Sequence, residues 1–232
     1  MKRRARRNKG KAVVLKSCLY VAALLILPFT VTLLLHLPDL FTRYNRITHQ
    51  MLFTGGGFLF FLILFLFFGP PVKSYILEHE LSHIIFALLS GVKVKQVVIR
   101  KNEGYVRTEK VNLVIALAPY SLPLYTLVSF VLYRTITLFY RSAVISSIFY
   151  SIMGLTLSFH FIATVHYLRL DQPDLKRYGY FPSLILIFTW SLCVISLVLA
   201  LLFERVQVLE YFRAAVMHGV DFYIGIVCYF FA

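Results

Sequence analysis

The sequence predicts an all-α integral membrane bundle of about six transmembrane or re-entrant helices, with one short, membrane-associated β-hairpin. Two observations predict this fold class. First, 59% of the 232 residues are hydrophobic and only 15% are charged, whereas soluble domains have about 25% charged residues. Second, the hydrophobic residues occur in runs of about twenty, which is the length of a helix that crosses the hydrocarbon core of a bilayer.

The apolar runs form several long segments and one shorter one. Because backbone amides inside a bilayer must be hydrogen-bonded internally, each segment is predicted to be a helix. The shorter segment, 74–90, follows a break at Gly69, Pro70 and Pro71 and ends at Gly91, a residue that commonly terminates helices. The long segments are 17–37, 50–69, 112–133, 143–166, 182–203 and 211–231.

Residues 92–110 have a different pattern from the segments around them. Val and Lys alternate over 92–95, and an apolar run over 97–99 follows. Polar residues and a glycine come next at Asn102, Glu103 and Gly104, and the strand pattern resumes with Tyr105 and Val106. This pattern is typical of two short strands joined by a turn, so 92–110 is predicted to be a β-hairpin. A solvated basic loop is the alternative.

Positive charge is concentrated at the N-terminus, where residues 1–16 contain eight of the 24 lysines and arginines. We expect a basic cytoplasmic arm that rests on anionic lipid, followed by a single polytopic membrane domain over 17–232. A basic arm can also bind nucleic acid, but the positive-inside bias explains this one more simply, and no nucleic-acid partner is expected. The apolar run from 18 to 37 is longer than the core of a signal peptide, so an uncleaved anchor is predicted.

The distribution of lysine and arginine between the segments predicts the orientation. If the arm, the hairpin and the loop 167–181 share the cytoplasmic side, that side has 17 lysines and arginines against six on the other. The N-terminus is therefore predicted to lie in the cytoplasm. This orientation requires residues 50–90 to cross the membrane once in net terms, and the sequence leaves open whether 50–69 or 74–90 is re-entrant.

The short segment contains the motif H-E-x-x-H, formed by His79, Glu80 and His83. Two histidines four residues apart lie on one helix face, so both can bind one Zn²⁺, and Glu80 can act as general base on a water that the metal activates. In a random ordering of these residues the motif would occur about once in two hundred cases. Ionisable residues inside a membrane usually serve a function; the alternative is a polar helix end in headgroup water.

The stretch EHELSHIIFALLSGVKV, followed by a hairpin with GYV, resembles the site-2-protease class of intramembrane zinc metallopeptidases, in its small bacterial M-fifty-B-like branch. The resemblance covers about residues 74–190 and implies a metallopeptidase-like core over 74–203. It implies a zinc endopeptidase of the bacterial cytoplasmic membrane that cuts membrane protein substrates. An unwound substrate could then pair with the strand at 94–99.

Zinc hydrolases usually bind the metal through three protein ligands and leave the fourth position to water, so a third ligand is needed. In the related family a later Asp follows a short polar step and opens a helix, and Asp174 matches this position; Asp171 is the alternative. For either Asp, helix N-capping is the simpler role. All candidates are Asp171, Asp174, His160, His166, His218 and Asp221.

The chain departs from the larger site-2 proteases at two signatures. Leu170 and Asp171 are not followed by the glycine of L-D-G, and the asparagine of G-P-x-x-N is missing after Pro119. Asn112 could be a hydrogen-bond donor to the substrate, although an asparagine at a helix start is more often a cap. Two other functions stay open: a catalytically inactive metal-binding or regulatory membrane protein, and a transporter that uses the His and Asp groups as an ion relay.

Overall fold

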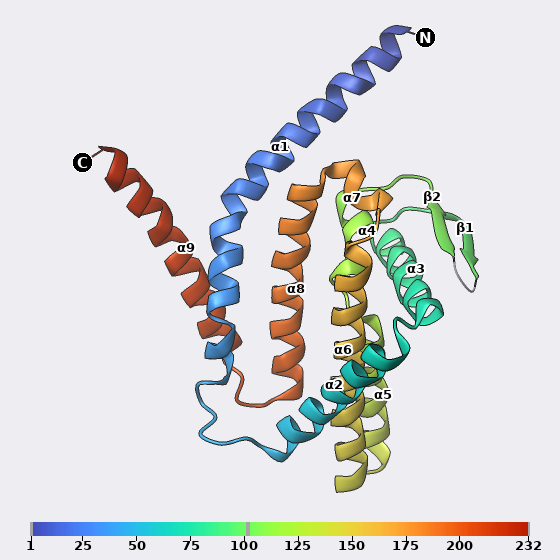
Figure 1. The fold of residues 1–232 in the computed structure, drawn as a ribbon, viewed down its shortest axis with the longest axis vertical. Helices are drawn as coiled ribbons and strands as arrows, with labels where there is room; N and C mark the ends of the chain where they lie inside the picture. Colours follow the sequence, from blue (N-terminus) through green and yellow to red (C-terminus); the bar gives the residue numbers. More distant parts are fainter. Residues whose placement is uncertain (1, 101–102, 232) are drawn as a thin grey trace. The chain divides into compact units, whose positions relative to one another are not determined.

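The computed structural model describes residues 2–100 and 103–231, and the side chains of 13–100 and 103–230 among them. Over these residues the chain is mostly helical, with one small antiparallel sheet (Figure 1). It divides into two compact units: residues 1–43 with 173–232, and residues 44–172. Each unit is described by itself.

The first unit consists of helices from both ends of the chain. Helix α1 packs against α8 and α9, and the short helix α7 packs against α8. Hydroxyl groups join these apolar helices: Thr30 and Thr189 hydrogen-bond at 2.6 Å, and the Tyr211 hydroxyl donates to the Leu33 carbonyl at 2.9 Å. Such contacts are typical of helix packing in membranes. The elements are α1 (Lys2–Leu35), the 3-10 helix η1 (Leu37–Phe41), α7 (Pro173–Tyr178), α8 (Tyr180–Leu202) and α9 (Val208–Phe231).

The basic arm predicted over residues 1–16 is continuous with the first apolar run, since α1 begins at Lys2. The side chains of residues 2–12 lie outside the described residues, and the expected contact with anionic lipid stays a prediction.

The second unit contains the H-E-x-x-H segment and the hairpin. Helix α2 lies along α6, and α5 packs on α6 as well (Figure 1). Helix α3 contacts both strands and the turn of helix that precedes α5. The elements are α2 (His49–Phe68), α3 (Val72–Leu89), β1 (Val94–Ile99), β2 (Gly104–Thr108), α4 (Leu113–Leu117), the 3-10 helix η2 (Ala118–Tyr120), α5 (Leu124–Phe139) and α6 (Ala143–Leu168).

Two glycines allow α2 and α6 to approach closely. A Cβ at Gly57 would lie 1.9 Å from the backbone oxygen of Ser151, and a Cβ at Gly154 would lie 1.8 Å from that of Thr54. Neither distance is possible for real atoms. The backbones of the two helices therefore touch at both positions, as small residues permit in membrane helix pairs.

The short helix and the hairpin are present as predicted. Helix α3 begins directly after Pro71, and Gly91 follows its end with a φ of 65°, a conformation that favours glycine. Strands β1 and β2 pair antiparallel, with Ile99 opposite Gly104. Gly104, predicted to lie in the turn, is thus the first residue of β2, whereas Asn102 of the predicted turn lies outside the described residues.

The predicted single helix over 112–133 is wrong. The structure breaks it into α4, η2 and α5, with a bend of 75° between the residues before and after the break. Proline explains the break, because Pro119 and Pro123 lack the amide hydrogen that a continuous helix needs.

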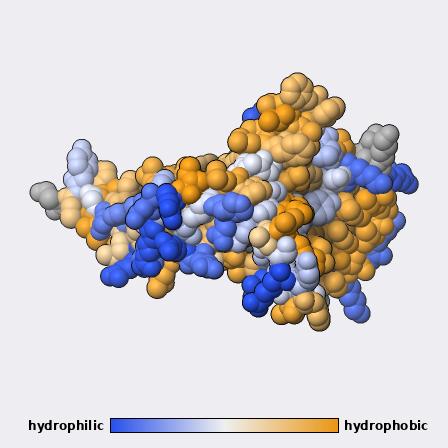
Figure 2. All heavy atoms as spheres, turned by 90° about the horizontal axis from the view of Figure 1, so that it is seen from below, coloured by the Kyte–Doolittle hydropathy of each residue, from blue (hydrophilic) through white to orange (hydrophobic). Residues whose placement is uncertain are grey.

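Among the residues that the structure describes, four helices are long and apolar enough to cross a membrane, or five if the bent pair is one span. They indicate a membrane protein, and hydrophobic side chains cover much of the face shown in Figure 2. Over the described residues, α9 is a helix but is not among these candidate spans, although its segment was one of the six long ones predicted. Helix α3, predicted as the shorter segment whose crossing the sequence left open, is not among them either. The four are 13–35 in α1, α2, α6 and α8.

Candidate metal centre

His79 and His83 lie one turn apart on the same face of α3, as the motif predicts. Their ring centroids are 4.9 Å apart and the rings are nearly perpendicular, at 85°. His79 is only 9% exposed. His83 is half-buried, so the first of the two rings is the better shielded from solvent.

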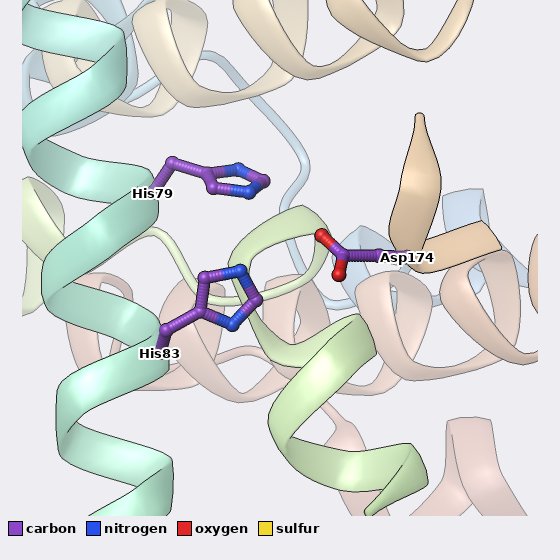
Figure 3. A group of neighbouring side chains, drawn as sticks. All are labelled: His79, His83 and Asp174. Carbon is purple, nitrogen blue, oxygen red and sulfur yellow. The ribbon is translucent and has the colours of Figure 1, made fainter. Parts of the chain in front are cut away.

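The two histidines form, with Asp174, a group that could bind a metal ion. One ring nitrogen of each His and one carboxylate oxygen of Asp174 all lie within 4.8 Å of one another (Figure 3). Ligands at about 2.0–2.2 Å from a tetrahedral zinc are roughly 3.3–3.5 Å apart. The group offers two imidazole nitrogens and one carboxylate oxygen, which are ligand types that zinc accepts.

The Nδ1 atom of each ring lies within hydrogen-bonding distance of an oxygen atom. The Nδ1 of His83 lies 2.8 Å from the Ile115 carbonyl oxygen. Because a carbonyl can only accept, Nδ1 is protonated and Nε2 keeps the lone pair that a metal needs. The Nδ1 of His79 lies 3.2 Å from the Tyr75 hydroxyl, and the Tyr75 ring stacks on Tyr167 with centroids 3.8 Å apart.

Asp174 is the second residue of α7. Two residues before it, Gln172 makes hydrogen bonds through both the oxygen and the nitrogen of its side-chain amide. The Tyr120 hydroxyl donates to Gln172 Oε1 at 3.2 Å, and Gln172 Nε2 donates to the Tyr167 carbonyl at 3.0 Å. The Tyr120 ring packs edge-on against His79, with centroids 5.1 Å apart. The chain two residues before Asp174 is thus fixed beside a tyrosine that contacts the first histidine.

The candidates for the third ligand have different surroundings. Asp171 is not a member of the group with His79 and His83, and its side chain is exposed. His160 pairs with Glu78, and His218 contacts His36, with 2.6 Å between the ring nitrogens. Of the residues that the structure describes, the group therefore includes Asp174, the residue that the sequence favoured.

Glu80, the predicted general base, is buried at 6% exposure on α3. The first residue of β2 packs directly over it: a Cβ at Gly104 would lie 2.9 Å from Glu80 Cγ and 3.2 Å from Oε1. The hairpin therefore closes over the carboxylate, and only glycine leaves room for it. Sequence reasoning missed this contact because a glycine after polar residues is typical of a turn.

Asn112 is a helix cap, as the simpler interpretation predicted. Its side-chain oxygen accepts from the backbone amide of Ile115 at 2.7 Å, at the start of α4. Its amide donates to the Ser90 hydroxyl at 3.3 Å. The cap thus fixes the residue whose carbonyl accepts from His83.

No protein-family model, curated protein or solved structure matches this chain. What the site does is therefore inferred from its residues.

Proposed function

We propose that this chain is an intramembrane zinc endopeptidase, similar to the site-2-protease class, that hydrolyses peptide bonds of membrane-bound protein substrates. One observation supports it above the others: ligand atoms of His79, His83 and Asp174 lie within 4.8 Å of one another, with Glu80 adjacent in the H-E-x-x-H motif. Two imidazoles, a carboxylate and a neighbouring glutamate are the donor set and base of zinc hydrolases.

The donor chemistry favours zinc over the other common divalent cations. Calcium and magnesium prefer oxygen ligands, whereas two of the three ligand atoms here are imidazole nitrogens. The hydrogen bond from His83 to the Ile115 carbonyl keeps Nε2 available, as metal-binding histidines require. A zinc ion bound here would supply Lewis-acid activation of water and of the scissile carbonyl.

Glu80 would move the proton. It is beside His79 in the sequence and is not a member of the ligand group, and its carboxylate would accept a proton from the attacking water and donate it to the leaving amine. Burial beneath Gly104 limits the directions in which this carboxylate can turn. A fixed base near the substrate is what general base catalysis needs.

A membrane-bound substrate fits the surroundings of the motif. Helix α3 belongs to the same compact unit as α2 and α6, two of the candidate spans. A peptide bond in a transmembrane helix is hydrogen-bonded within the helix, so the substrate must unwind before cleavage. Strand β1 pairs with β2 on one side only, and its other edge would accept the extended segment by β-augmentation.

The positive-inside bias supports the orientation. The N-terminus, the hairpin and the loop 167–181 would face the cytoplasm, so cleavage would occur near the cytoplasmic side of a bacterial membrane. Cysteine labelling of Lys95 and Arg134 variants with a membrane-impermeant reagent tests this, because the two positions are predicted to lie on opposite sides.

The deciding experiment measures zinc content and cleavage of a single-span model substrate in proteoliposomes. Wild type should bind one zinc and cut. Glu80→Gln should keep the zinc but lose cleavage, and His83→Ala should lose both. Glu103→Gln, on the exposed hairpin, is the matched control and should cut like wild type. Cleavage by Glu80→Gln at the wild-type rate would refute the proposal, and zinc without any cleavage would favour the inactive metal-binding protein.

A further inference from the structure

Glu78 and His160 form a buried pair that the H-E-x-x-H chemistry does not use. Glu78 Oε2 on α3 lies 3.4 Å from His160 Nδ1 on α6, and their side chains are 3% and 8% exposed. A carboxylate at such a position is costly unless a partner and hydrogen bonds compensate for its lost hydration. The pair therefore has a fixed geometry.

The other carboxylate oxygen of Glu78 contacts the start of α5. It accepts from the Tyr125 backbone amide at 3.3 Å, in the first turn of α5, where amide groups have no partner within the helix. The positive end of the helix dipole favours a carboxylate there. The Tyr125 hydroxyl in turn donates to the Ser74 carbonyl of α3 at 2.9 Å. One residue of α3 thus joins both α5 and α6.

A second contact joins the same face of α3 to the same face of α6. Tyr75 lies three residues before Glu78 and stacks on Tyr167, which lies seven residues after His160. Residues three apart, and residues seven apart, share a helix face. Helix α6 therefore contacts α3 at two points, and two points fix the rotation of α3 about its own axis.

This rotation decides where the imidazoles point. Glu78 precedes His79, and consecutive helical residues are about 100° apart around the axis. The Glu78 contact therefore lies beside the face that presents His79 and His83, and leaves that face available to a metal.

We infer that Glu78 and His160 are a positioning pair, which holds α3 at the rotation that brings His79 and His83 to a common metal ion. Neither residue is a ligand. The inference rests on the proposed metal centre, and it adds a requirement that the motif itself does not contain. Replacing either partner leaves the other buried without its counterpart, which allows α3 to turn and the two imidazoles to diverge.

The test uses the full-length protein loaded with Co²⁺, whose visible absorption reports the geometry of its ligands. Glu78→Gln and His160→Gln should each weaken the absorption of four-coordinate Co²⁺ and lower zinc affinity by about ten-fold or more. The double variant should recover part of both losses, because two amides can hydrogen-bond to each other. His36→Gln is the matched control, since His36 is also paired with a carboxylate, Asp39, at 2.6 Å.

A purely structural role would change the melting temperature but not the spectrum of the folded protein. Wild-type Co²⁺ spectra and zinc affinity in both single variants would therefore overturn the inference. If Glu78→Gln does not fold, His160→Gln decides, because it keeps the bond between Glu78 and Tyr125. The His83→Ala variant separates the two proposals: if it binds zinc like wild type, the metal centre itself is wrong, and if it does not, the Glu78 and His160 results test the positioning role alone.

Discussion

His83 Nδ1 donates to the backbone carbonyl of Ile115 at 2.8 Å, and this bond joins the second histidine of the motif to a residue 32 positions later. The carbonyl is held in place because Asn112 caps α4 and accepts from the Ile115 amide. The orientation of a proposed metal ligand thus depends on a helix cap outside the motif.

Replacing this cap should weaken metal binding. Asn112→Ala removes the acceptor, which should lower the free energy of unfolding by about 1 kcal/mol and reduce zinc affinity by about ten-fold, as changes behind a ligand do. Asn112→Asp keeps a capping oxygen and should behave nearly like wild type. Competition with a chelator measures the affinity. Equal zinc affinities in the Ala and Asp variants would show that the cap does not act on His83.

Gly104 should be required for turnover and not for metal binding. In Gly104→Ala the new Cβ would lie 2.5 Å from Ile76 Cγ2 and 2.9 Å from Glu80 Cγ, so the hairpin or the Glu80 side chain must move. Because Glu80 is the proposed base, we expect kcat to fall by about ten-fold or more with zinc content unchanged. Gly55→Ala is the control, since a Cβ there has nothing within 4 Å. Full activity in Gly104→Ala would mean that the contact does not position Glu80.

Local sequence patterns predicted the elements that depend on local chemistry. The limits of α3 follow from Pro71 and Gly91, and the hairpin follows from alternation around a polar turn. The motif residues and Asp174 were also named from spacing and from the resemblance, and the two histidines form a group with Asp174 that could bind a metal ion. These features require no knowledge of which distant segments meet.

The features that the sequence did not predict depend on contacts between distant segments. Glu78 lies in an apolar segment beside the motif, but nothing near it in the chain indicates His160, which is 82 positions away. From the sequence alone, Gly104 is typical of a turn. Its second role, to leave room for Glu80, is visible only in the packing of β2 on α3. The two prolines at 119 and 123 did indicate a break in the helix. The high hydrophobicity of 112–133 nevertheless led to the prediction of one continuous helix.

The contact between α2 and α6 should tolerate a methyl group at one glycine and not at its neighbour. Gly57→Ala places a Cβ 1.9 Å from the Ser151 backbone oxygen, so the helices must separate, whereas Gly56 has nothing within 4 Å. Overpacking typically costs about 1–3 kcal/mol. We therefore expect Gly57→Ala to lower the melting temperature in detergent and Gly56→Ala to leave it equal or raise it. Equal melting temperatures for the two variants would contradict backbone contact at Gly57.

Asp174 and Asp171 should differ in their effect on the metal, although they are three residues apart. Asp174→Ala removes a proposed ligand and should lower zinc affinity by more than about 100-fold, beyond the range typical of residues behind a ligand. Asp171→Ala should bind zinc like wild type, since Asp171 is not a member of the group. Metal analysis after dialysis against a chelator measures both.

Gln172, two residues before Asp174, bonds through its side-chain amide to the Tyr120 hydroxyl and to the Tyr167 carbonyl. Gln172→Ala should free the segment before Asp174 and give an intermediate loss of zinc, while Gln172→Glu keeps an acceptor for the Tyr120 hydroxyl and should lose less. If Asp171→Ala released the metal and Asp174→Ala retained it, the third ligand would be Asp171. In that case the Asp174 carboxylate would have to point away from the two histidines, unlike the arrangement in Figure 3.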